Sequence, residues 1–128
     1  MSLLVSSRQK ALGAYVVMLT GEINGQTYPV LENKLDQLLE ERPTVIVLDM
    51  AEVNYLSSAG IRVILKTKKM LTAYAGKLVF MNLQPQIKKV FEIINALPSM
   101  RVFKDLNEMD DYLDRMQRKV TGASEEDS

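Results

Sequence analysis

The stretch TVIVLDMAEVNYLSSAGIRVIL, residues 44–65, contains the transition on which the fold depends. Its first part, 44–50, is a nearly continuous apolar run of strand length, typical of a strand that is covered on both faces of a sheet. From Ser58 onward, apolar residues recur at three- and four-residue steps, as on one side of an amphipathic helix. Between these patterns, residues 57–60 (SSAG) place four small residues at one turn. The stretch therefore predicts a strand, a tight turn and a helix.

Strand and helix patterns alternate on both sides of this stretch. We expect Thr27 to cap the preceding helix, Pro29 to lie in its first turn and Pro43 to stop it. The predicted elements are strands at 3–7 and 13–21, a helix within 27–43, the strand at 44–50, a helix at 58–75 ended by Gly76, a strand at 77–83, a helix at 85–97, a strand at 100–103 and a helix at 107–119.

This order predicts an α/β fold: an N-terminal hairpin, then alternating strands and helices around a mostly parallel central sheet. We expect one domain over residues 1–120 and a disordered acidic tail, TGASEEDS, over 121–128. Ligand and partner sites of such sheets tend to lie beyond the carboxyl ends of the strands. The small-residue turn at 57–60 follows a strand directly, so it is the first candidate site.

The composition argues against an enzyme. The chain of 128 residues has neither cysteine nor histidine, which excludes thiolate nucleophiles, histidine-based triads and histidine or cysteine metal sites. We therefore expect no catalytic residue, no metal site and no cofactor. The charges of sixteen basic and sixteen acidic residues cancel, so the net charge does not favour binding to nucleic acid. The apolar segment 11–19 is too short to span a bilayer and lacks a following cleavage pattern, so we expect a cytoplasmic protein without membrane insertion.

The turn at 57–60 has a structural and a functional interpretation. In the structural one, a serine caps the helix, while Ala59 and Gly60 permit close packing against the sheet; local evidence alone favours it. In the functional one, Ser57 is the cap and the side chain of Ser58, at the first helical position, faces solvent. Compared with alanine, a glycine in the first turn of a helix lowers the stability of the helix by about 1 kcal/mol. Such a cost fits a position that the backbone of another molecule must approach closely. The helix N-terminus would also accommodate a phosphate on Ser58.

Three stretches of the sequence resemble one known family. Residues 45–65 are similar to the signature of bacterial anti-sigma factor antagonists, the single-domain STAS proteins, in which an apolar strand ending in aspartate leads to a (D/S)-S-(S/A)-G-(L/I) turn and a helix. GEIN at 21–24, followed by Thr27, resembles the family's G-(E/D)-(I/L)-D…T loop. Residues 75–97 resemble its GG-x-L-x-L…(S/P)-P-x-V-x-x-x-L-x-x-x-G-L stretch. The resemblance covers about residues 12–118.

The resemblance implies a binding switch rather than an enzyme. Unphosphorylated family members bind an anti-sigma factor that is also a serine kinase, and this binding frees a sigma factor. The kinase phosphorylates the serine that precedes the small residue and the glycine, here Ser58, and a PP2C-type serine phosphatase removes the phosphate. We expect a monomer or weak homodimer. The expected partner-binding residues are Asn24, Ser57, Ala59, Gly60 and Arg62, with Arg62 contacting the kinase or a phosphate or remaining solvated.

The sequence departs from the family pattern at a few positions. Ser57 stands where aspartate is frequent, which keeps Ser57 open as an alternative phosphoacceptor. Asn24 replaces the loop aspartate and so removes a charge near the expected kinase contact. Residues 96–98 lack the glycine that ends the third helix in the family, and we expect only a local change there.

The helix after the turn carries a second apolar stripe. Val63, Met70 and Tyr74 fall opposite the expected core face, and they are either scattered exposed residues or a surface for a partner or a second copy. The core face itself is expected to comprise Ile61, Ile64, Leu65, Leu71 and Ala75.

Two other functions compete with an anti-sigma factor antagonist. Small STAS proteins also serve in other partner-switching pathways or as subunits bound to lipid-trafficking membrane transporters. An enzyme is a further alternative, and the absence of histidine, cysteine and a P-loop argues against it.

Overall fold

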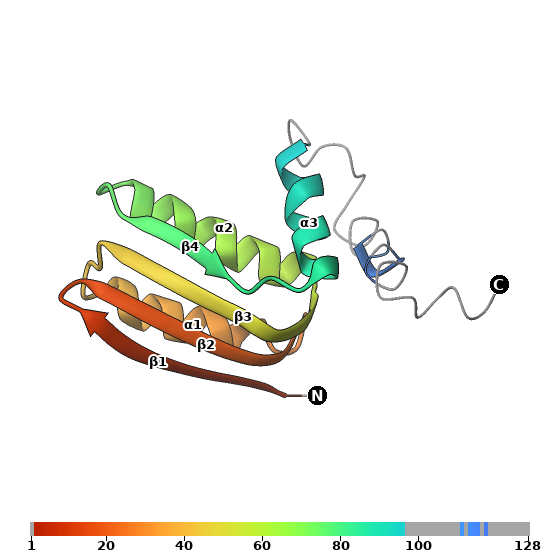
Figure 1. Cartoon of the computed structure of the whole chain (residues 1–128), viewed down its shortest axis with the longest axis horizontal. Coiled ribbons are helices and arrows are strands. Elements are labelled where there is room, and N and C mark those ends of the chain that lie inside the picture. Colours follow the sequence, from red (N-terminus) through yellow and green to blue (C-terminus); the bar gives the residue numbers. More distant parts are fainter. Residues whose placement is uncertain (1, 97–110, 112, 116, 118–128) are drawn as a thin grey trace.

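The computed structural model describes residues 2–96, 111, 113–115 and 117. The predicted strand at 100–103, most of the helix at 107–119 and the acidic tail lie outside these residues, so the expected domain boundaries stay a prediction. Figure 1 shows the elements in order: β1 (Leu3–Ala11), β2 (Ala14–Ile23), α1 (Tyr28–Leu39), β3 (Val45–Leu56), α2 (Ser58–Thr72), β4 (Lys77–Met81) and α3 (Pro85–Ala96).

The strands form one sheet in the order β1-β2-β3-β4. β1 runs antiparallel to β2 as a hairpin, whereas β2, β3 and β4 run parallel to one another. The predicted hairpin, the alternation that follows it and the mostly parallel sheet are thus confirmed.

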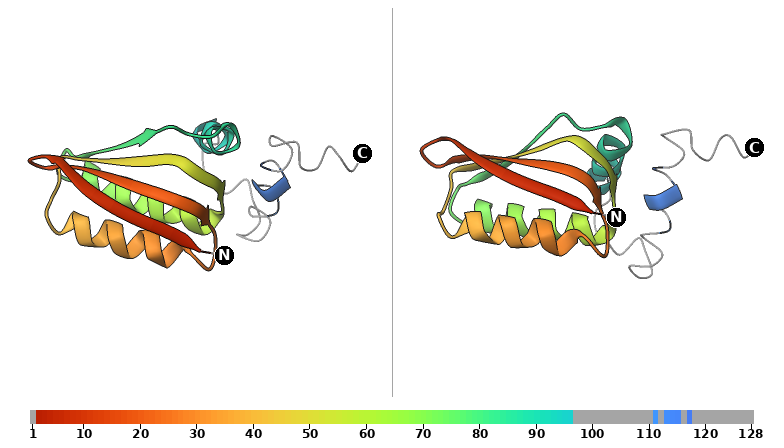
Figure 2. Two further views of the ribbon diagram at one scale, coloured as in Figure 1. Left: turned by 60° about the horizontal axis from the view of Figure 1, so that its bottom comes forward. Right: turned by 90° about the horizontal axis from the view of Figure 1, so that it is seen from below.

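Helices α1 and α2 lie side by side on the same face of the sheet (Figure 2). The strand order explains this arrangement. The connections β2–α1–β3 and β3–α2–β4 both progress in the same direction across the sheet, and right-handed crossovers then place both helices on one side. The core fills the space between this face and the two helices, with Ile46, Leu48 and Met50 of β3 fully buried in it.

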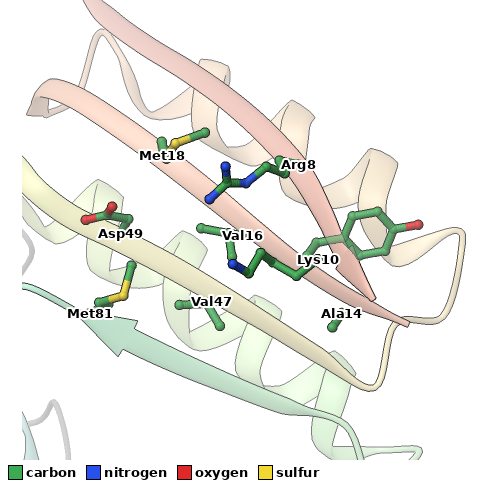
Figure 3. Close-up of a pocket in the computed structure, with 9 residues that line it drawn as sticks. Arg8, Lys10, Ala14, Val16, Met18, Val47, Asp49 and Met81 are labelled. Atoms are coloured by element: carbon green, nitrogen blue, oxygen red, sulfur yellow. The ribbon is translucent and has the colours of Figure 1, made fainter. Parts of the chain in front are cut away.

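The other face of the sheet corrects one sequence expectation. The strand at 44–50 was expected to be covered on both faces, yet Val45, Val47 and Asp49 of β3 are only half-buried. Figure 3 shows this open face with the helices behind the sheet: Arg8 and Lys10 from β1 reach over Val16 of β2, and they line one shallow pocket with Val47 and Asp49 of β3. A continuous apolar run predicts correctly that alternate residues of the strand are buried. It does not predict whether a helix also covers the residues between them, on the other face of the sheet.

β3 is longer than its apolar run, because it continues through Glu52 and Asn54 to Leu56. Its pairing with β4 ends at Asp49, so residues 50–56 project beyond β4. Glutamine side chains take over part of the missing pairing on that side. Nε2 of Gln84 donates to the carbonyl of Ala51 (2.8 Å), Nε2 of Gln86 donates to that of Asn54 (3.1 Å), and the carboxamide of Gln117 binds Leu56.

The predicted ends of the first two helices shift by a few residues. α1 stops at Leu39 because Arg42, with φ 47°, already adopts the left-handed conformation before Pro43. α2 stops at Thr72, and the left-handed residue after it is Ala75 (φ 69°) rather than Gly76. Gly76 is needed for a different reason: a Cβ there would lie 3.1 Å from the carbonyl oxygen of Leu71 and 3.2 Å from that of Pro43.

The second apolar stripe of α2 is not one continuous surface. Val63 is buried, because α2 packs against α1 as well as against the sheet. Tyr74 is half-buried; its hydroxyl donates to the carbonyl of Pro43 (2.9 Å), and the guanidinium of Arg42 stacks 4.4 Å from its ring centre. Met70 is exposed, and so are Leu65 and Ala75, which the periodicity assigned to the core.

None of the helices in the described ranges is long and apolar enough to cross a membrane.

Replacing Ala75 with glycine should stabilise the fold. A left-handed conformation costs a residue with a Cβ about 1–2 kcal/mol, and glycine is spared this strain. After the larger chain entropy of unfolded glycine is subtracted, we expect a gain of up to about 1 kcal/mol in the free energy of unfolding, measured by urea denaturation. Ala73→Gly is the matched control because Ala73 has φ −59°; it should destabilise. If the two variants lost the same free energy of unfolding, Ala75 would not carry the strain assigned to it.

Candidate functional site

The small-residue turn lies at the carboxyl ends of β2 and β3, where the sequence predicted a site. Ile23 is the last paired residue of β2 and lies opposite Leu56 of β3. The amide of Ser57 then donates to the carbonyl of Ile23 (2.9 Å), and α2 begins at Ser58. Strand and helix thus join within two residues, directly beside the β2–α1 loop.

Gly60 explains why the turn needs so small a residue. A Cβ at this position would lie 2.5 Å from Cγ2 of Ile23 and 2.6 Å from Cδ1 of Leu56, both fully buried. The first turn of α2 therefore rests directly on the ends of two strands. This supports the structural interpretation of Gly60: its own chain, rather than another molecule, occupies the space beside it.

Gly60→Ala should destabilise the protein, although the same change favours an isolated helix by about 1 kcal/mol. The added methyl group would overpack the contact with Ile23 and Leu56, for which we expect a loss of about 1–3 kcal/mol in the free energy of unfolding. Urea denaturation measures the change. Gly25→Ala is the control, because a Cβ at Gly25 would meet no atom within 4 Å. A Gly60→Ala protein as stable as the parent would show that the contact is not tight.

Both serines of the turn are buried, with 6% of Ser57 and 2% of Ser58 exposed. This corrects the expectation that Ser58 faces solvent. Ser57 does occupy the cap position of α2 with an extended backbone (φ −92°, ψ 175°), but its side chain makes no capping hydrogen bond. Among the described residues, its buried Oγ finds no hydrogen-bond partner at all. The close contact at Gly60 brings the start of α2, including both serines, against the strand ends.

The β2–α1 loop beside the turn is held by its own side chains. Oδ1 of Asn24 accepts hydrogen bonds from the amides of Gln26 (2.9 Å) and Thr27 (3.0 Å). The hydroxyl of Thr27 donates to the carbonyl of Glu22 (2.7 Å) and accepts from the amide of Asn24 (2.9 Å). Thr27 occupies the cap position of α1, as expected, but its hydroxyl closes the loop and makes no capping hydrogen bond to the helix. Pro29 lies in the first turn of that helix, also as expected.

A shallow cleft between α1 and α2 adds an accessible surface to the site. Its volume is about 270 Å³, and it brings Ala59 and the exposed Arg62 together with Tyr28, whose amide is bonded to the carbonyl of Asn24 (3.0 Å). At its far side, Nζ of Lys66 donates to Glu32 (2.6 Å), and this hydrogen bond raises the pKa of Lys66. Of the predicted partner residues, Arg62 is the one with an exposed side chain.

Two residues of the site escaped the sequence analysis. Tyr28 lines the cleft, but in the sequence nothing distinguishes it from any other residue in the first turn of a helix. Gln117 binds the backbone of Leu56 from 61 positions away, and an isolated glutamine in a helical pattern carries no signal of such a contact.

The site offers a hydroxyl at a helix start and little else for chemistry. No group of three or more acidic side chains in the described part of the chain could hold a metal ion. The N-terminus of α2 is the positive end of the helix dipole, which favours an anion.

Comparison with known proteins places the chain in a family. The STAS domain model matches residues 7–109, and the chain therefore belongs to the STAS domain family. It is similar to BtrV of Bordetella bronchiseptica, with 36% identity over 85 residues, 66% of this chain and 73% of BtrV. It is also similar to the anti-sigma-B factor antagonist of Bacillus subtilis, with 32% identity over 77 residues, 60% of this chain and 70% of that protein.

Solved structures agree on the fold. The anti-sigma factor antagonist SpoIIAA in its unphosphorylated form superposes with a TM-score of 0.62 at 21% identity, over 70% of this chain and 83% of that one. The phosphorylated form of SpoIIAA from Bacillus gives a TM-score of 0.61 at 21% identity, over 71% and 83% of the two chains.

Proposed function

We propose that the chain is an anti-sigma factor antagonist that acts by partner switching at Ser58. The observation that carries the proposal is the position of Ser58: it is the first residue of α2, at the carboxyl edge of a STAS fold. Two similar proteins support it, one named an anti-sigma-B factor antagonist and the other described in an unphosphorylated and a phosphorylated form. In this role the unphosphorylated chain binds an anti-sigma factor with serine kinase activity and works in the cytoplasm as a substrate, not as an enzyme.

The proposed partner surface consists of Asn24, the turn at 57–60 and Arg62. The turn supplies little exposed area itself, so the cleft with Tyr28 and Arg62 is the part that a partner meets first. A guanidinium at such a place pairs well with a carboxylate or a phosphate of the partner.

Phosphorylation would change this surface without unfolding the domain. A phosphoserine carries about −1.5 to −2 charges, which the N-terminus of a helix stabilises. The same charge within a packed interface lacks a partner, and leaving it unpaired there costs several kcal/mol. The kinase would then release the chain, and a PP2C-type serine phosphatase would restore binding by removing the phosphate.

Substitutions at Ser58 should separate the two states. The probe is the serine kinase encoded nearest to this chain, and Ser58→Ala should bind it like the parent. Ser58→Asp should bind about a hundredfold more weakly, because an unpaired charge in the interface that costs about 2.8 kcal/mol of binding free energy lowers the affinity by that factor. Isothermal titration calorimetry measures both affinities. Ser57→Ala is the matched control and should bind like the parent, and thermal melting confirms that each variant is folded.

Equal affinities of the folded Ser58→Asp and Ser58→Ala proteins would contradict the switch. If a pulldown with the unmodified chain recovered a transporter ATPase in place of a kinase, the role of a transporter subunit would replace this proposal.

A further inference from the structure

The sheet face opposite α1 and α2 is apolar and, in the described part of the chain, only partly covered. β2, β3 and β4 run parallel, and parallel sheets are normally covered on both faces. On this face Val79 is 42% and Met81 is 38% exposed, and Val47 is half-buried. Exposed apolar side chains that adjoin one another in this way are typical of a surface that another molecule binds.

The strand register arranges the residues of this face in rows across the sheet. One row crosses all four strands and consists of Arg8, Val16, Val47 and Val79. The neighbouring row consists of Met18, Asp49 and Met81. Because paired residues of adjacent strands point to the same side of a sheet, the two rows form one surface. This surface is apolar over β2, β3 and β4 and becomes basic at β1.

A shallow pocket of about 340 Å³ lies on this surface, and every residue that lines it comes from a strand. Its floor is apolar. Figure 3 shows Arg8 and Lys10 of β1 reaching over Val16, and the stems of these long side chains leave Val16 only 8% exposed. The guanidinium and the ammonium group therefore lie along one side of an apolar floor.

The charge at this pocket is positive. Within the described residues, neither Arg8 nor Lys10 takes part in an ion pair. Asp49 supplies the carboxylate of the pocket, and it already accepts hydrogen bonds from the amide of Ala51 (3.2 Å) and from Nδ2 of Asn82 (3.2 Å). The pocket is therefore complementary to an apolar surface that carries carboxylates along one flank.

An α-helix is the element that fits such a face, since the faces of parallel sheets are ordinarily covered by helices. Arg8 and Lys10 are two residues apart on one strand, which separates them by about 6.8 Å along it. On a helix, residues four apart lie on the same side and are separated by about 6 Å along the axis. Two acidic residues four apart, beside an apolar stripe, would therefore meet the two cations.

We propose that this face of the sheet binds an acidic amphipathic helix of another protein, with Arg8 and Lys10 pairing with two of its carboxylates. A second copy of the chain fits less well, because contact through the same face would double these cations without adding a free carboxylate. The face lies on the other side of the sheet from α1 and α2, whose cleft contains Arg62 (Figure 2). The inference therefore does not depend on the proposed function.

Photo-crosslinking in the organism that encodes the chain provides the first test. Met81→p-benzoylphenylalanine places the crosslinker at an exposed residue of the pocket. We expect a bond to an acidic amphipathic segment of another protein, identified by peptide mass spectrometry. Adding Arg8→Glu and Lys10→Glu should lower the yield about tenfold, because carboxylates would then face carboxylates. Lys88→Glu with Lys89→Glu, at exposed positions of α3, is the matched control and should leave the yield unchanged.

A synthetic peptide with the sequence of the crosslinked segment then gives the affinity. In fluorescence anisotropy with the purified chain, we expect binding that weakens as salt is added, because salt screens the charge pairs. Reversing Arg8 and Lys10 should weaken it about tenfold, and the control reversal on α3 should not. Circular dichroism verifies that each variant is folded. If the Met81 variant is not, Val79→p-benzoylphenylalanine places the crosslinker in the neighbouring row.

The proposal is overturned if the folded crosslinking variant captures a second copy, another part of its own chain, a lipid or nothing at all. A captured protein segment without acidic residues beside an apolar stripe would overturn it as well. So would a yield or an affinity that survives the reversal of Arg8 and Lys10.

Discussion

The contact of Gly60 with Ile23 and Leu56 is the constraint on which the site depends. It lets the first turn of α2 pack directly on the side chains at the ends of β2 and β3. As a result, the strand passes into the helix at Ser57, and Ser58 becomes the first helical residue. The small residues of the turn are thus required by packing, and their smallness does not itself indicate chemistry. What distinguishes the turn is that packing fixes a serine at a helix N-terminus, where an added phosphate is electrostatically favoured.

The length of β3 has a second consequence for the site. Because this strand projects beyond β4, the chain must supply other partners for its backbone groups, and glutamine side chains from distant segments do so. Gln117 connects the C-terminal part of the chain to the residue two positions before the proposed phosphoacceptor. Ser58 itself is buried.

The sequence predicted the parts of the fold that depend on local patterns: the hairpin, the alternation of strands and helices, and the position of the turn. Interactions between distant segments account for the parts it missed. The one-sided cover of the sheet follows from the handedness of two crossovers, while the apolar run of β3 looks the same whether one face or both are covered. The contact of Gln117 with Leu56 joins residues 61 positions apart, so no local pattern predicts it. The stripe through Val63 was misassigned because α2 packs against α1 as well as the sheet.

The central claim is that Ser58 receives a phosphate from a partner kinase. The most direct measurement is to incubate the purified chain with ATP and the serine kinase encoded nearest to it, and to locate any phosphate by peptide mass spectrometry. The account predicts a single phosphate on Ser58, which is lost in Ser58→Ala and retained in Ser57→Ala. Phosphate on Ser57 instead, or an unmodified chain in the presence of a kinase that is active on another antagonist, would contradict it.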